Sequence, residues 1–154
     1  MKKMMLFFIP IFFAYCNNHS EQKSVAAAYL GVWKVYRIDA GSKSALTTSE
    51  ADSLFNNKTI EIDTTSCKLF DEICARCSYT IKRVNSEEYL FDEYRVSAKK
   101  VGIQVDSMTE IEVSCLGKDQ NYMEYFPSEL YLLNIDHLIL AYEGMFLHLK
   151  RLSP

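Results

Sequence analysis

Short runs rich in β-branched and aromatic residues, separated by turn residues, fill most of this chain after position 29. In 58–63, Ile60 and Ile62 lie on one face and polar residues on the other, the alternation that is typical of a half-buried β-strand. Such a series favours an all-β fold. The expected strands are 30–38, 58–63, 77–84, 88–94, 99–105, 109–115, 129–133, 137–142 and 145–151.

Tight turns separate the expected strands. Asn85-Ser86 and 134–136 are turn sequences, and Glu143-Gly144 lies between two apolar runs, the two-residue hairpin arrangement with Gly at positive φ. Many short strands joined in this way predict an antiparallel, up-and-down barrel of about 8–9 strands. Closure into a barrel also removes the exposed edges that an open sheet would present.

One segment is expected to be helical. Thr47 is followed three residues later by Glu50, the pattern of a capping box, and apolar residues then recur at helical spacing. The pattern predicts a short helix over 48–56, between the first and second strands. Such a helix is either a lid over one end of the barrel or a packing plug with no gating role, and we prefer the plug.

The first fifteen residues have the pattern of a secretory signal. Lys2 and Lys3 give a positive start, and residues 4–15 form an apolar run. This run is too short to cross a bilayer as a helix, which takes about 20 residues, whereas a signal peptide has such a charged start and short apolar run. We expect residues 1–15 to be a signal peptide and the protein to be exported. Cleavage near this point without lipid, an uncleaved anchor and a core strand are the alternatives.

Cys16 directly follows the apolar run, and polar residues follow Cys16. This arrangement resembles the lipobox of bacterial lipoproteins, in which the thiol is acylated and becomes the first residue of the mature chain. The resemblance implies lipidation at Cys16, a lipid-anchored or periplasmic place in the bacterial cell envelope, and membrane contact through the lipid only. Residues 16–27 are then a polar tether, and 28–152 form the barrel domain.

The composition fits one acidic globular domain. The 154 residues are 49% apolar and 13% aromatic, which is too apolar for a disordered chain. Without residues 1–15 the chain keeps 15 basic and 20 acidic residues, a formal charge of −5, and its basic residues form only pairs such as Lys99-Lys100. Because phosphate contacts need clustered Lys and Arg, we exclude nucleic acid as a partner. We expect a monomer.

Four cysteines stand within the expected domain: Cys67, Cys74, Cys77 and Cys115. In an oxidising compartment they indicate two disulfides, with three connectivities open. Cys74 and Cys77 form a CxxC pair, but a strand pattern follows it where a thioredoxin-like redox motif needs a helix. A zinc site of four thiols is the other alternative, although no His lies near them in sequence. We expect structural disulfides and no metal.

Catalytic patterns are not evident in the sequence. It has no Ser/His/Asp spacing and no glycine-rich phosphate loop. His137 and His148 have apolar neighbours, and a single His on a strand is more often a structural residue than a ligand. We therefore expect no enzyme activity, no catalytic residue and no cofactor.

The first strand opens with Gly31-Val32-Trp33, which resembles the G-x-W motif of lipocalins and related calycins. In that family the Trp packs at the closed end of the barrel, and a basic residue of the last strand lies across its indole. Arg151 ends the last expected strand and matches that partner. A guanidinium over a Trp face gains about 0.5–2 kcal/mol. The resemblance implies a lipocalin-like barrel whose closed end holds Trp33 and Arg151.

Residues 30–152 are also similar to a group of small, exported, lipocalin-like bacterial proteins with little assigned biochemistry. The shared features are the Trp-containing first strand, Cys74 shortly before Tyr79, Cys115 in a later strand, and an ending like 138–146 running to Arg151. The resemblance implies a Cys74–Cys115 disulfide. Cys67 and Cys77 look like additions to the two-cysteine pattern of the group, which leaves them for a second bridge.

Alternation from Trp33 assigns the inward face of the first strand. Val35 and Arg37 are expected inside, and Tyr79 and Tyr142 are expected on the apolar lining. Arg37 is then a lone inward charge that could anchor an anionic head group, with the two tyrosines near the mouth. The alternative is that Arg37 lies in water or pairs with an acid. On the last strand the same count puts Met145, Leu147 and Leu149 inside and Phe146, His148 and Lys150 outside.

Two functions are compatible with these expectations. One is a carrier of a small hydrophobic ligand inside the barrel, and the large interior residues leave little room for it. The other is a module or inhibitor that binds an envelope protein through the outer surface of a filled barrel. For the second, aromatic side chains crowd one late region and would serve as interface anchors: Tyr122, Tyr125, Phe126 and Tyr131.

Overall fold

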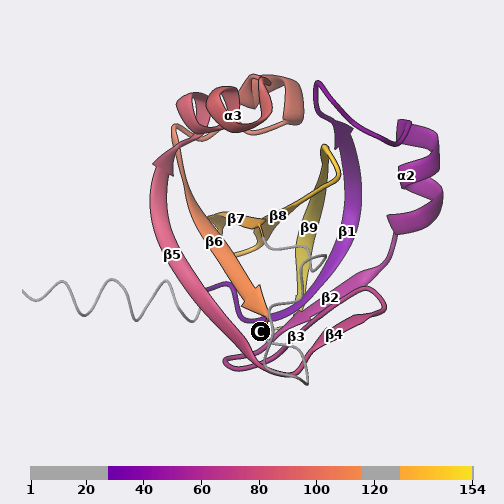
Figure 1. Ribbon diagram of the computed structural model, residues 1–154, viewed down its shortest axis with the longest axis vertical. Helices are drawn as coiled ribbons and strands as arrows, with labels where there is room; N and C mark the ends of the chain where they lie inside the picture. The colour runs from indigo at the N-terminus through magenta and orange to yellow at the C-terminus, as the bar shows by residue number, and fades with distance from the viewer. Residues whose placement is uncertain (1–27, 116–128, 154) are drawn as a thin grey trace, which may run out of the picture.

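The structure is a computed structural model that describes residues 28–115 and 129–153. Within these residues nine antiparallel strands form one sheet, which curls into a nearly closed barrel (Figure 1). The predicted antiparallel, up-and-down barrel is therefore confirmed. The strands are β1 (Gly31–Ala40), β2 (Thr59–Ile62), β3 (Cys67–Leu69), β4 (Glu72–Cys74), β5 (Cys77–Asn85), β6 (Ser107–Cys115), β7 (Glu129–Asn134), β8 (His137–Tyr142) and β9 (Met145–Ser153).

The order of the strands leaves one gap in the barrel. Neighbours in the sheet follow the order β4-β3-β2-β1-β9-β8-β7-β6-β5, so β1 and β9 pair while β4 and β5 are the two edges. We call the place where these edges meet the seam: the β3–β4 hairpin, residues 67–74, on one side and the start of β5 on the other. Since β4 and β5 do not pair as strands, a disulfide and single hydrogen bonds close the barrel at the seam.

The helix predicted after the first strand is present as α2 (Thr48–Phe55). The side chain of Thr47 accepts a hydrogen bond from the backbone N–H of Glu50 at 3.2 Å. In return, the Glu50 carboxylate accepts a hydrogen bond from the backbone N–H of Thr47 at 2.8 Å. This is the predicted capping box. The Phe55 ring lies 5.0 Å from that of Phe70 and 5.4 Å from that of Tyr142, so α2 packs against the barrel core.

Two predicted strands are wrong. Residues 88–94 belong to the helix α3 (Ser86–Tyr94), and the strand expected over 99–105 is replaced by the short 3-10 helix η1 (Ala98–Val101) and the loop after it. The side chain of Asn85 caps α3 by accepting the N–H of Glu88 at 3.0 Å. Asn85-Ser86 is therefore a helix start and not a hairpin turn. In Figure 1, α3 lies across one end of β5 and β6.

Alternating side chains of the strands build two cores. The outer one lies between α3, η1 and the outer face of the sheet, and its fully buried members include Leu90, Val101, Tyr131, Ile139 and Phe146. The inward and outward assignment made for β9 is confirmed, but Phe146 and His148, which face out, are buried under η1 and α3. The inner core's fully buried members include Trp33, Val35, Ile60, Ile111, Leu130, Leu138, Leu140, Met145, Leu147 and Leu149.

The turn between β8 and β9 is the predicted two-residue hairpin. Tyr142 and Met145 face each other, and Glu143 and Gly144 both have positive φ values, 48° and 77°. Two positive φ values in succession define the primed turn whose twist matches that of the strands. A side chain at Gly144 would meet the carbonyl of Lys43 at 2.4 Å, so this glycine also permits a close backbone approach.

Candidate functional site

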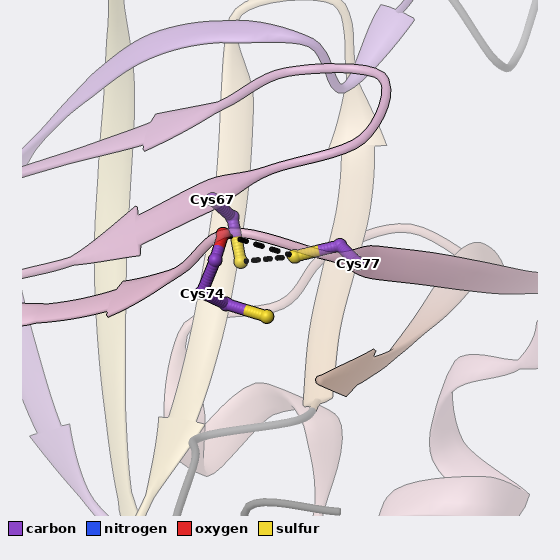
Figure 2. Close-up of side chains that lie close together, drawn as sticks. All are labelled: Cys67, Cys74 and Cys77. Carbon is purple, nitrogen blue, oxygen red and sulfur yellow. Dashed lines mark hydrogen bonds between the residues drawn. The ribbon is translucent and has the colours of Figure 1, made fainter. Parts of the chain in front are cut away.

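The four cysteines of the domain converge at the seam. Cys67 on β3 faces Cys74 on β4, and Cys77 on β5 faces Cys115 on β6. Each pair consists of register partners in one strand ladder, and the two ladders meet edge to edge. Figure 2 shows three of these side chains pointing toward one another, and their Sγ atoms all lie within 4.8 Å of one another.

One of the two expected disulfides is present. Cys74 and Cys115 are joined, with their Cα atoms 5.8 Å apart, so the bond ties β4 to β6 across the seam. The expected second bridge is not formed in this structure. Cys67 and Cys77 are free thiols whose Sγ atoms lie 3.0 Å apart, drawn as a hydrogen bond in Figure 2.

Hydrogen bonds also cross the seam. The backbone N–H of Cys77 donates to the carbonyl of Thr65 at 2.8 Å. The hydroxyl of Tyr79 lies 2.7 Å from the carbonyl oxygen of Asp63 and 3.1 Å from that of Ser66. Tyr79 is therefore engaged in closing the barrel.

The surroundings of Cys67 favour a neutral thiol. Burial is the main cause that raises the pKa of Cys67, and the hydrogen bond to Cys77 raises it further. A thiol must lose its proton to bind a metal ion, and a tetrathiolate site needs four thiolates. Cys74 and Cys115 are already bonded to each other. The spacing of the sulfurs fits a thiophilic cation. A disulfide and a neutral thiol, however, do not supply the thiolates that such a cation needs.

The predicted contact between Trp33 and Arg151 is present at the end of the barrel where β1 begins and β9 ends, which we call the floor. The guanidinium of Arg151 is 4.2 Å from the centre of the Trp33 ring. It also donates to the carbonyl oxygens of Ile135 and Leu30, each at 2.6 Å, and to that of Ala28. The Arg151 guanidinium thus stacks on the indole and binds two segments through its donors: the residues just before β1 and the β7–β8 turn.

The three residues proposed for ligand binding are not brought together. Arg37 faces outward, because the pairing of β1 with β9 has a register shift between Val35 and Arg37 that changes the alternation. The expected inward Arg37 is therefore wrong, and the alternative holds: the guanidinium pairs with Asp39 at 2.8 Å and is half exposed. Tyr142 packs its ring against Phe55, and Tyr79 lies at the seam.

A buried polar chain on the outer face was not predicted. His148, fully buried on β9, places Nε2 2.9 Å from the Asp39 carboxylate and 3.0 Å from the carbonyl oxygen of Val101 in η1. Its Nδ1 lies 3.0 Å from Nε2 of His137 on β8. The two histidines lie diagonally across the β8–β9 ladder, in which His137 pairs with Lys150 and His148 pairs with Ile139, a contact that spacing along the chain could not reveal.

Burial sets the protonation state of the two histidines. It lowers the pKa of His148 to about 4, and the neighbouring His137 and Arg37 act in the same direction, while Asp39 opposes them. Burial also lowers the pKa of His137. Both imidazoles are therefore neutral near pH 7. Because both neighbours of His148 Nε2 are acceptors, this nitrogen carries the proton and His137 donates to Nδ1.

The predicted aromatic anchors fall into two groups. Tyr131 is fully buried under α3, where its hydroxyl bonds the Glu129 carboxylate at 2.9 Å, so it is not a surface anchor. Tyr122, Tyr125 and Phe126 lie outside the described residues. Cys16 and the expected signal and tether also lie outside them.

No family model, no curated protein and no solved structure matches this chain. Among the described residues, no helix is long and apolar enough to span a membrane.

A surface hollow near the floor is one outward feature of the described strands. It has a volume of about 380 Å³ and is lined by parts of β6 and of β7 with its turn, including Thr109, Leu132 and Ile135. Ile135 is 67% exposed and Leu152 on β9 is 52% exposed. The backbone N–H of Arg151 donates to the carbonyl oxygen of Asp136, which places the segments that carry these two residues side by side.

Proposed function

We propose that this protein is an exported, lipid-anchored, lipocalin-like barrel with no enzymatic activity that binds an envelope protein through its outer surface. In this proposal the barrel is a rigid scaffold and its interior holds no ligand. The choice between this function and a carrier of small hydrophobic molecules depends on the space inside the barrel.

The packed interior is the observation that carries the proposal. Inward side chains from β1, β2 and β6 to β9 are large, apolar and fully buried against one another. An eight- to nine-stranded barrel is just wide enough for side chains to fill, so leucines and a tryptophan at these positions use the room that a ligand would need. The outward position of Arg37 removes the expected anchor for an anionic head group.

The location is inferred from the N-terminal sequence. Lys2, Lys3 and the short apolar run before Cys16 support export and acylation. A lipid at Cys16, followed by a tether over 16–27, would hold the barrel at a membrane surface. The Cys74–Cys115 disulfide is consistent with an oxidising compartment. The Trp33–Arg151 pair is the feature that supports the likeness to lipocalins.

The floor hollow and the apolar pair Ile135 and Leu152 are the surface that we assign to the partner. Exposed apolar side chains beside a hollow are the usual anchors of a protein interface. Both side chains are more than half exposed, so their replacement by serine should leave the fold intact.

The test compares partner capture by three forms of the full-length protein in its native envelope. After chemical cross-linking, we expect a defined protein to be attached to the wild type and its yield to fall at least tenfold for Ile135→Ser/Leu152→Ser. Leu54→Ser on α2 is the matched control, since Leu54 is also 52% exposed, and it should retain the partner. Equal yields for all three forms would contradict this surface.

A further inference from the structure

We propose that Cys67 and Cys77 form a redox-controlled latch on the seam, which closes as a second disulfide by exchange with a low-molecular-weight disulfide or a disulfide-bearing protein. The latch joins β3 to β5. It concerns the folded domain alone and does not rest on the proposed function.

The two thiols are already positioned for this bond. Their Sγ atoms are 3.0 Å apart, and they come from strands on opposite sides of the seam. The hydrogen bond from Cys77 N–H to the Thr65 carbonyl holds the start of β5 beside the residues that precede Cys67. Bond formation then needs the two Sγ atoms to approach each other by only about 1 Å, to the usual S–S length of about 2.05 Å.

The two sulfurs differ in access, which sets the order of the reaction. Cys77 is half-buried whereas Cys67 is buried, and burial raises the pKa of the Cys67 thiol. The thiolate is the nucleophile in exchange. The Cys77 thiolate therefore attacks a sulfur of the external disulfide, forming a mixed disulfide and expelling one thiolate of the oxidant.

Cys67 completes the reaction. Its thiol loses its proton and attacks the Cys77 sulfur, so the Cys67–Cys77 bond forms and the second thiolate of the oxidant leaves. The two thiolates of the oxidant take up the protons that Cys77 and Cys67 release. Two protein thiols are oxidised, and one external disulfide is reduced to two thiols. The adjacent Cys74–Cys115 bond is unchanged.

The consequence is mechanical. Within the described residues β4 and β5 share no ladder, and the β3–β4 hairpin consists of two three-residue strands. Its covalent tie runs from β4 to β6 through Cys74. A second tie from β3 to β5 would fasten the other strand of the hairpin. The latch therefore sets how readily the barrel opens at its seam.

The experiment uses full-length protein carrying Cys16→Ser, so that the thiols of the domain are measured alone. It is equilibrated with reduced or oxidised glutathione, alkylated and mapped by mass spectrometry without reduction. We expect oxidised glutathione to remove both free thiols and to link the peptides of Cys67 and Cys77. Hydrogen exchange of residues 59–74 should slow at least fivefold on oxidation and recover on mild reduction.

Single variants test the order of the steps. Cys67→Ala should stop at a stable mixed disulfide of Cys77 with glutathione, because no second thiol resolves it. Cys77→Ala should leave the buried Cys67 thiol largely unmodified. The proposal would be overturned if both thiols of the parent protein could still be alkylated after treatment with oxidised glutathione while the Cys74–Cys115 bond stays intact. A Cys74–Cys77 linkage, or one Zn²⁺ held by all four sulfurs after purification, would overturn it equally. These readouts need no substitution within the barrel domain.

Discussion

At the scale of single residues, a few polar side chains determine how the ends and faces of this barrel are arranged. Arg151 is the clearest case, because one guanidinium stacks on Trp33 and donates to three backbone carbonyl groups around the floor. Its charge alone would be satisfied by water. The planar fork is what matches several acceptors and one aromatic face together.

Arg151→Lys should therefore destabilise the protein although it keeps the charge. A lysine has no planar fork, so carbonyl groups at the floor lose their donors and the stacking weakens. We expect the free energy of unfolding, measured by urea denaturation, to fall by roughly 2–3 kcal/mol. Lys150→Met is the matched control on the exposed neighbour and should change it by less than about 0.5 kcal/mol. Equal effects of the two changes would refute the role of the fork.

His148 makes stability depend on pH. Its folded pKa is lowered to about 4, whereas an unfolded chain has a histidine pKa of about 6.5. Between these values the unfolded chain binds a proton that the folded chain does not, so stability falls as the pH drops from 6.5 toward 4. Because His148 is fully buried, its share is about 3 kcal/mol in all.

An NMR titration measures this pKa directly. The imidazole signal of His148, assigned by its disappearance in His148→Phe, should keep its neutral position at pH 6 and shift only near pH 4. A midpoint near 6.5 would mean that Asp39 offsets the effect of burial, and the predicted loss of stability on acidification would then be absent.

At the scale of elements, local patterns predicted most strands and the first helix but not the second. In α2 the capping box and the helical spacing agree, and the packing of Phe55 agrees with both. In α3 the aromatic residues suit a strand as well as a helix, and the helix prevails because Asn85 caps it and Leu90 is buried against the outer face. The deciding surface belongs to other strands and cannot be seen locally.

Removal of the α3 cap tests this assignment. Asn85→Ala leaves the N–H of Glu88 without its acceptor and should lower the free energy of unfolding by about 1 kcal/mol. Asn85→Asp keeps an acceptor oxygen and should be nearly neutral. Hydrogen exchange should show faster exchange in 86–94 for the alanine variant only. If both variants behave alike, the cap does not stabilise this helix.

Other features lay beyond sequence reasoning for physical reasons. The strands β3 and β4 have three residues each, too few to show alternation. The register shift after Val35 turns Arg37 outward, and nothing in the order of residues marks it. His137 and His148 meet only through the β8–β9 ladder. By contrast, the convergence of Trp33 with Arg151 was predictable from the family resemblance.

At the scale of the whole molecule, β1 pairs with β9 inside the sheet, so the edge strands β4 and β5 meet at the seam, which a disulfide and a few hydrogen bonds hold together. The Cys74–Cys115 bond spans a sequence separation of 41 residues and joins strands that do not pair. It therefore restricts the unfolded chain and also closes the native barrel.

Loss of this disulfide should destabilise the domain markedly. For Cys74→Ala/Cys115→Ala we expect the free energy of unfolding to fall by about 2–4 kcal/mol under oxidising conditions. The wild type measured in a strong reductant is the control, and most of the difference between the two proteins should vanish there. An undiminished difference in reductant would assign the loss to packing and not to the bond.

The proposed function requires a filled barrel that acts through its outer surface. Mass spectrometry tests this most directly, on protein purified from its native envelope under mild conditions and measured intact and after organic extraction. We predict no small molecule at a stoichiometric amount in the extract, together with an intact mass that carries the lipid on Cys16. One equivalent of an apolar compound released from the folded protein would contradict the claim and establish a carrier.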